Sequence, residues 1–263
     1  MRTFAIVNMK GGVGKTTTAI NLAYLLATEY QLRVLLVDAD GQRNATRTLL
    51  PSRDYDGLAA LLEGFVGCYD EVIEPTDIDN LDMIPASAAL WSVDLKCAMG
   101  EGREGAFRAL RDVRDNVMED NSYDVMVIDC PPHFSASCIS AIAAANSIII
   151  PVVPDAYSAE GMKDLVEQID GVRKIHPTVR VAGCLITNWH SADVVVDATE
   201  YLREASPVPV YTSVIRRTDK VLESTWAREP VLVWSPQSSA ARDYRAWVRE
   251  LVTKEGMLHG EEV

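Results

Sequence analysis

A run of glycines, lysines and threonines near the N-terminus has the residue types that bind phosphate. It reads Lys10-Gly-Gly-Val-Gly-Lys-Thr-Thr17 and lies between a strand-like apolar segment and a helix-like one. Glycines let backbone N–H groups approach phosphate oxygens, and the start of the following helix adds a partial positive charge. The run therefore predicts a phosphate-binding loop whose backbone is supplied by Gly11, Gly12, Val13 and Gly14.

Three side chains at the end of this loop have expected roles toward a nucleoside triphosphate. Lys15 is expected to bridge the β- and γ-phosphates, and the hydroxyl of Thr16 to ligate Mg²⁺. Thr17 is placed to contact the α-phosphate. Met9 occupies the position where the common pattern G-x-x-x-x-G-K-[ST] has its first glycine, so the match is incomplete at that end.

Carboxylates follow two other apolar segments. Asp38 and Asp40 come directly after Val34–Val37, and Asp129 ends the run that begins at Val125. In an open α/β sheet, ligands bind at the edge where the carboxyl ends of the strands meet. Because carboxylates suit Mg²⁺, we expect Asp38 and Asp129 near the metal, in contact with it through water.

Short apolar segments alternate with helical patterns along the chain. Continuous apolar character predicts strands that are covered on both faces, and the alternation predicts βαβ units. The expected class is α/β, with a doubly wound, mostly parallel sheet flanked by helices in one domain over residues 1–263. We expect the polar end, Glu255–Val263, to fray. The predicted strands are Phe4–Val7, Val34–Val37, Leu81–Ile84, Val125–Ile128, Ile148–Val153 and Val181–Ile186, and the predicted helices are Thr17–Leu26, Ala106–Met118, Ala159–Val172, Ala192–Leu202 and Gln237–Val252.

The composition limits the classes of protein that this chain can be. It has 25 Lys and Arg against 38 Asp and Glu, a net charge of −13, so a polyanion must bind a local basic patch. The segment Ser52–Asp82 is especially acidic and is a candidate surface for a basic peptide. The five cysteines lack CxxC spacing, which favours reduced thiols in a cytoplasm. We find no leader-like start and no apolar run of about 18 residues, so we expect neither secretion nor a membrane span.

A second lysine, Lys10, opens the phosphate-binding loop, and two further segments have familiar patterns. The segment Asp38-Ala-Asp-Gly-Gln-Arg-Asn-Ala-Thr46 resembles the switch I pattern D-x-D-P-Q-G-N-A-T, with Gly41 where Pro is common and Arg43 where Gly is common. The segment Ile150–Gly161 resembles P-V-x-x-E-Y-F-A-L-E-G. Together these motifs resemble the deviant Walker A ATPases, and most of all their ParA/Soj DNA-partitioning branch. The resemblance covers nearly the whole chain.

The resemblance implies ATP and Mg²⁺ as cofactors and a homodimer that forms on ATP binding. Lys10 would cross the dimer interface to the nucleotide of the other subunit, and Asp40 would orient the attacking water. With Lys15, these two residues are the expected catalytic set. Asn188 matches an adenine-contacting position, and Arg217 lies in a segment that borders the base. Hydrolysis would be slow until a ParB-like adaptor protein accelerates it.

The resemblance also implies binding to nonspecific double-stranded DNA, and hence a cytoplasmic protein associated with the nucleoid. Lys220 aligns with a basic position used by relatives, and Arg216 and Arg217 lie close by in sequence. Arg203 and Arg228 are lesser candidates. Such contacts would be made to phosphates, so they would be sensitive to salt and blind to sequence.

Several alternatives within and beyond this family remain open. A MinD-like membrane role needs an apolar C-terminal helix face, which the acidic tail lacks. An iron–sulfur carrier needs thiolates at a dimer interface, and neither Cys97 nor Cys130 has suitable surroundings. The others are an ATPase that positions a non-DNA cargo, a metabolic enzyme with a phosphate-binding loop such as a biotin-pathway synthetase, and a nucleotide-binding regulator that hydrolyses nothing. Lys10 and Asp40 argue against this last alternative.

Overall fold

An eight-stranded sheet forms the centre of the protein. The structure, a computed structural model, describes residues 1–51, 54–66, 68–155, 157–173 and 177–257. The strands are β1 (Arg2–Ile6), β2 (Val34–Asp38), β3 (Glu74–Pro75), β4 (Leu81–Ile84), β5 (Val125–Asp129), β6 (Ser147–Val152), β7 (Arg180–Trp189) and β8 (Val210–Arg216). Their order is β3-β4-β2-β5-β1-β6-β7-β8, and all pairings are parallel except that of β3 with β4.

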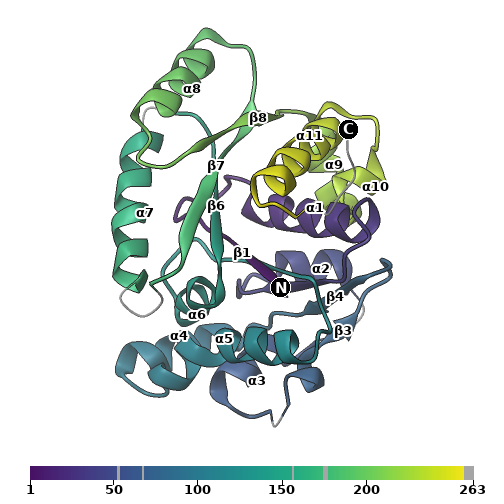
Figure 1. Cartoon of the computed structure of the whole chain (residues 1–263), viewed down its shortest axis with the longest axis vertical. Coiled ribbons are helices and arrows are strands. Elements are labelled where there is room, and N and C mark those ends of the chain that lie inside the picture. Colours follow the sequence, from purple (N-terminus) through teal and green to yellow (C-terminus); the bar gives the residue numbers. More distant parts are fainter. Residues whose placement is uncertain (52–53, 67, 156, 174–176, 258–263) are drawn as a thin grey trace.

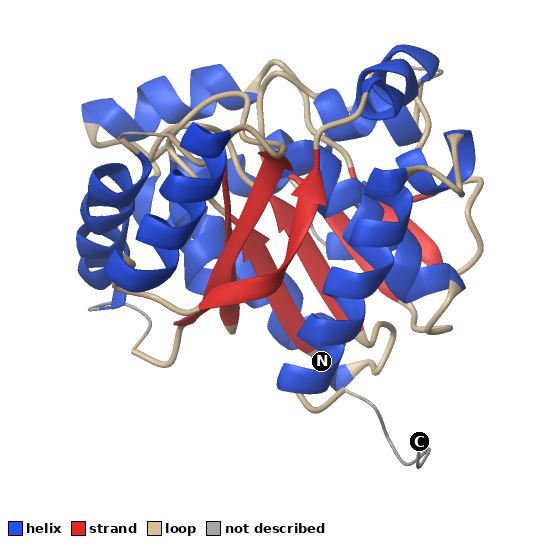
Figure 2. Cartoon of the chain, turned by 90° about the horizontal axis from the view of Figure 1, so that it is seen from above, coloured by secondary structure: helices blue, strands red, loops and turns tan. Residues whose placement is uncertain are grey.

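Helices cover both faces of this sheet (Figures 1 and 2). Alternate residues of β1 enter opposite cores: Ala5 packs with the face that includes α3 to α7, and Phe4 and Ile6 pack with α1, α2, α10 and α11. The helices are α1 (Lys15–Thr28), α2 (Asn44–Leu49), α3 (Gly57–Glu63), the 3-10 helix η1 (Tyr69–Val72), α4 (Leu90–Met99), α5 (Arg103–Glu119), α6 (Ala136–Ala144), α7 (Ser158–Arg173), α8 (Asp193–Ala205), α9 (Asp219–Ala227), α10 (Val231–Trp234) and α11 (Ser239–Lys254).

This arrangement confirms the predicted doubly wound, mostly parallel α/β sheet. Each of the six predicted strands is present, and the sequence patterns missed β3 and β8. β8 lies at the edge of the sheet and mixes buried with exposed residues, so it has no continuous apolar run. None of the helices among the described residues has the length and apolar character needed to cross a membrane.

The prediction that the chain frays from Glu255 onward is wrong at its first residues. The side chain of Glu255 is buried, and its carboxylate forms ion pairs with Arg180 and, at 3.8 Å, with Arg2. Met257 packs partly against the core beside α11. Two guanidinium groups make burial of the carboxylate favourable, and this fastens the C-terminal segment to the start of β1 and β7. The rest of the predicted tail, 258–263, lies outside the described residues.

The turn from β2 into α2 shows what one departure from the family pattern costs. Arg43 caps α2 with φ 62° and ψ 33°, which is left-handed backbone that favours glycine. Its guanidinium pairs at 3.2 Å with Asp54, whose side chain is 98% exposed, and such a pair contributes little. The family's glycine therefore suits the backbone, whereas arginine strains it.

Replacing Arg43 tests this strain. We expect Arg43→Gly to be more stable than Arg43→Ala by about 1 kcal/mol, because alanine keeps the Cβ that the left-handed backbone disfavours. Both variants lose the guanidinium, so the difference between their unfolding free energies reports the backbone conformation alone. Urea unfolding measures the difference. An alanine variant as stable as the glycine variant would contradict the strain.

Candidate nucleotide and metal site

The predicted phosphate-binding loop joins β1 to the N-terminus of α1. Gly12 and Gly14 have φ 74° and 83°, so both use backbone conformations that favour glycine. The hydroxyl of Thr187 at the end of β7 donates a hydrogen bond to Val13 O at 2.9 Å and lies 3.1 Å from Val152 O. The loop is thus fastened to strands far away in the sequence, and its N–H groups lie at the start of a helix.

Lys15 lies in the mouth of this loop. Its side chain is only 7% exposed, and Nζ donates to the carbonyl of Lys10 at 3.0 Å. Burial lowers the pKa of Lys15, and the negative charges of Asp129 and Asp40 partly offset this effect. The ammonium group therefore gains from an added anion, and the phosphates of a nucleotide supply one.

Asp38 and Asp129 are fully buried neighbours across β2 and β5. Asp38 accepts hydrogen bonds from the backbone N–H and hydroxyl of Thr46, both at 2.8 Å, and from the N–H of Asp40 at 3.1 Å. Neither oxygen of Asp129 meets full hydrogen-bond geometry with a described residue, but the Thr16 hydroxyl lies close enough to lower the pKa of this carboxyl. Burial raises the pKa of Asp38 to about 6 and that of Asp129 well above its usual range. A buried carboxylate of this kind fits a divalent cation.

Asp40 continues the loop after β2 and is 8% exposed. Its carboxylate accepts the N–H of Gln42 at 2.9 Å, and its charge acts on both Lys15 and Asp129. These three side chains are therefore close enough to act on one ligand. The Thr46 hydroxyl, which holds Asp38, also accepts the N–H of Ala86 at 2.9 Å, so the loop is bound to the segment after β4.

Helix α4 contacts the loops that follow β2 and β5, and sequence reasoning missed this role. A Cβ added at Gly41 would lie 2.4 Å from Nε1 of Trp91, so the indole lies directly on the backbone beside Asp40. Asp94 accepts the N–H of Ala136 at 2.9 Å and lies 3.7 Å from Nε2 of His133. Neither Trp91 nor Asp94 belongs to a local motif, so only the fold reveals them.

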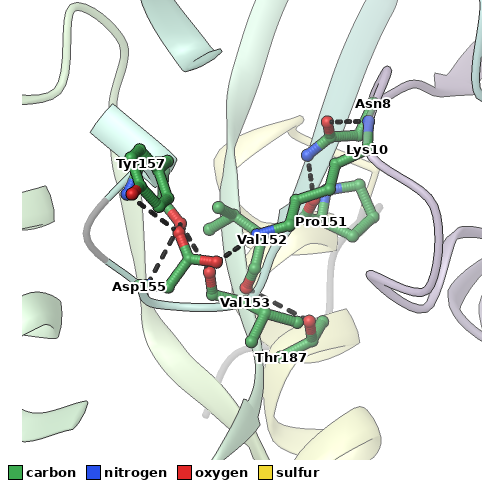
Figure 3. A network of polar contacts seen from close by, with 9 residues as sticks. Asn8, Lys10, Pro151, Val152, Val153, Asp155, Tyr157 and Thr187 are labelled. Atoms are coloured by element: carbon green, nitrogen blue, oxygen red, sulfur yellow. Dashed lines mark hydrogen bonds and ion pairs between the residues drawn. The ribbon is translucent and has the colours of Figure 1, made fainter. Parts of the chain in front are cut away.

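Lys10 points away from the loop and pairs with Asp155, from the segment after β6 (Figure 3). Its backbone N–H donates to Asn8 at 2.9 Å, and Asn8 donates in turn to Pro151 O at 2.7 Å. Asp155 is itself held by the N–H of Tyr157 at 3.1 Å and by the hydroxyl of Ser158 at 2.7 Å. The lysine side chain is 48% exposed, so this ion pair is screened by water and costs little to break.

A pocket of about 550 Å³ adjoins the phosphate-binding loop on the side of β7 and β8. Its lining brings Thr17, Asn188 and Arg217 together with Leu222 of α9. Asn188 has φ 54°, a left-handed conformation that asparagine tolerates better than most residues. A larger hollow of about 690 Å³ lies among α3, α4 and α5, away from the loop. Of these two pockets, the first is lined by residues of the phosphate-binding loop and the second is not.

The three predicted DNA-binding residues are not equally free. Arg216 makes a two-pronged ion pair with Asp243, with contacts between 2.7 and 3.2 Å, and Lys220 pairs with Glu223 at 2.8 Å. The Arg217 guanidinium forms neither a hydrogen bond nor an ion pair with a described residue. Two of the three predicted DNA-binding residues thus have an acid partner, and the third has none within the described part of the chain.

The contact between Gly41 and Trp91 makes a sharp prediction for ATP hydrolysis. We expect Gly41→Ala to lower the rate by about tenfold or more, because the added methyl group displaces the loop that carries Asp40. The double variant Gly41→Ala/Trp91→Ala should recover most of the activity. Gly105→Ala, which adds a methyl group into open space on α5, is the matched control. A double variant as slow as the single one would contradict the steric explanation.

Known proteins with similar sequences and structures point to one family. A family model described as AAA domain matches residues 1–181. The chromosome partitioning protein ParA of Caulobacter vibrioides is 32% identical, with 97% of this chain and 95% of that protein covered. The sporulation initiation inhibitor protein Soj of Bacillus subtilis is 33% identical, with 94% and 96% covered.

A solved structure is similar over the same length. The cobyrinic acid a,c-diamide synthase of Mycobacterium smegmatis, with bound ATP analogue and magnesium, superposes with a TM-score of 0.80 at 27% identity, with 97% of this chain and 96% of that chain covered. The relatives that exceed 30% identity include proteins named for partitioning. With the loop, the buried carboxylates and the sheet order described above, they show that the chain belongs to the ParA/Soj family of P-loop ATPases.

Proposed function

We propose that this chain is an ATP-driven dimerisation switch that binds nonspecific DNA and partitions a plasmid or chromosome. The observation that carries the proposal is the position of Lys10. It lies in the phosphate-binding loop, yet its side chain leaves the loop's own site and is held by one exposed ion pair. A lysine with a weak resting partner is free to reach a second subunit.

ATP and Mg²⁺ are the cofactors of this ATPase. Lys15 and the loop backbone hold the phosphates, with Thr17 beside the α-phosphate, and Asn188 and Arg217 border the base. The hydroxyl of Thr16, which already acts on Asp129, would ligate the metal, and the buried carboxylate of Asp129 would hold it through water. Bound Mg²⁺ neutralises charge on the phosphates during transfer. Asp38 uses its acceptors within the protein, so it positions the loop more than the metal.

Dimer formation would complete the catalytic set. In a face-to-face homodimer, Lys10 of each subunit would leave Asp155 and place its charge near the partner's nucleotide, where it stabilises the transferring phosphoryl group. Asp40 would orient the attacking water. Hydrolysis would then dissolve the dimer, and a ParB-like adaptor would accelerate this step. The protein would act in the cytoplasm at the nucleoid.

Partitioning is favoured over the other activities by the relatives' own names. ParA of Caulobacter vibrioides and Soj of Thermus thermophilus, at 32% and 33% identity, are named for chromosome partitioning, whereas the synthase name belongs to a structure at 27%. An ATPase that positions a non-DNA cargo is the second candidate. It would share the switch and differ in its partner.

Removing the carboxylate of Asp40 tests the hydrolytic step. We expect Asp40→Ala to bind ATP and dimerise but to lose turnover by about a hundredfold, so that the ATP dimer persists in light scattering over time. Asp54→Ala removes an exposed carboxylate of a nearby loop and serves as the control. Unchanged turnover in Asp40→Ala would remove this residue from the mechanism.

Binding to nonspecific duplex DNA, with ATP against ADP across a salt series, tests the DNA role. We expect tight binding with ATP that weakens steeply with salt, and weak binding with ADP. ATP-driven dimerisation without any DNA binding would refute the DNA role and favour the non-DNA cargo.

A further inference from the structure

Three arginines surround one hollow of about 350 Å³ beside α2. Arg43 and Arg47 come from the start and middle of this short helix, and Arg228 comes from the turn between α9 and α10. Arg47 and Arg228 also line a second hollow of about 370 Å³, which extends to Thr16 and Thr17 on α1. Because Arg47 and Arg228 line both hollows, the two hollows adjoin. Helix α2, which carries Arg47, and helix α10, which follows Arg228, both pack against α1 (Figure 1). We call these three residues the arginine surface.

The charges of the arginine surface are largely unpaired. Arg47 and Arg228 are exposed, and neither guanidinium has a hydrogen bond or ion pair with a described residue. Arg43 pairs only with Asp54, whose side chain is 98% exposed, and its buried Nε has no described partner. The chain has a net charge of −13, yet two of these arginines form no ion pair with a described residue. Their charges are therefore available to a ligand.

Backbone strain marks the same place. Arg43 has φ 62° and Arg228 has φ 59°, and both angles lie in the left-handed region where glycine is the unstrained residue. Two of the three arginines thus occupy positions at which their own side chains disfavour the fold. At Arg228 this conformation is also an ordinary way to end a helix, so Arg43 is the residue whose strain favours a binding role.

We propose that the arginine surface binds phosphate groups of the backbone of duplex DNA, and this rests on the DNA role proposed above. Guanidinium groups recognise phosphate oxygens in pairs, without reading the bases. The exposed arginines span two adjoining hollows, so the anion contacts run along the surface and suit a row of phosphates better than one enclosed ion. By contrast, Arg216 and Lys220 on β8 and α9 each have an acid partner within the protein.

The test compares two double variants that each remove two positive charges. Arg47→Ala/Arg228→Gly acts on the arginine surface, and the glycine relieves strain, so the fold is maintained. The control Arg108→Ala/Lys163→Ala removes exposed charges from α5 and α7. Binding of a labelled nonspecific duplex is measured across a salt series with a saturating non-hydrolysable ATP analogue. Nucleotide affinity and dimer mass are measured in parallel.

We expect the arginine-surface variant to lose at least about tenfold in DNA affinity, with the magnitude of the salt slope falling by about 4, because each subunit of the dimer loses two phosphate contacts. The control should keep both the affinity and the slope of the unmodified protein. Nucleotide affinity and dimer mass should be unchanged in both variants.

Three outcomes would overturn the proposal in distinguishable ways. If the unmodified protein binds no duplex, the proposed DNA function fails and this inference fails with it. If the unmodified protein binds duplex and the arginine-surface variant binds it equally well, only the inference fails. If the variant loses affinity for the ATP analogue and keeps its affinity for DNA, these arginines serve the nucleotide.

Discussion

Two buried carboxylates side by side, Asp38 and Asp129, are the constraint around which the site is organised. Burial opposes their charge, and each makes ionisation of the other harder. The protein compensates Asp38 with three internal donors, whereas Asp129 has only the Thr16 hydroxyl and the Lys15 ammonium to favour its charge. A nucleotide phosphate would supply a negative charge beside Lys15, and its Mg²⁺ a positive charge beside Asp129. Nucleotide binding would therefore stabilise the folded state of the site.

Hydrogen bonds of these carboxylates and their neighbours connect the site to segments far away in the sequence. Asp38 holds Thr46, and the hydroxyl of Thr46 holds Ala86 after β4, so the loop after β2 is connected to its neighbours through one side chain. Trp91 covers this loop, and Asp94 on the same helix holds the start of α6. A shift of the loop after β2 or of the loop after β5 must therefore move α4, or else break the contact of Trp91 with Gly41 or that of Asp94 with Ala136. The Lys10–Asp155 pair adds a third element, since ATP would compete with it for the lysine.

The sequence predicted those parts of the site that are contiguous in the chain or follow a strand. The loop from Lys10 to Thr17 was found because its spacing is local, and Asp129 because it ends an apolar run. Thr187 and Trp91 could not be found in this way, because each acts on a segment that only folding brings near it. The replacement of glycine at position 43 was visible, but its left-handed backbone was not. The edge strand β8 was missed for a related reason, since a half-exposed strand lacks a continuous apolar run.

An acidic protein can bind a polyanion if the relevant charges are local and are repeated. At physiological salt the Debye length is about 8 Å, so carboxylates elsewhere on the molecule are largely screened from a phosphate held by Arg47. Few such contacts in one subunit give weak binding, because each guanidinium–phosphate contact in water contributes little alone. A dimer presents every contact twice on one rigid body, and the second subunit then binds at high effective concentration. Under the proposed function, ATP dependence of DNA binding would follow from dimerisation itself, with no change needed in the shape of the arginine surface.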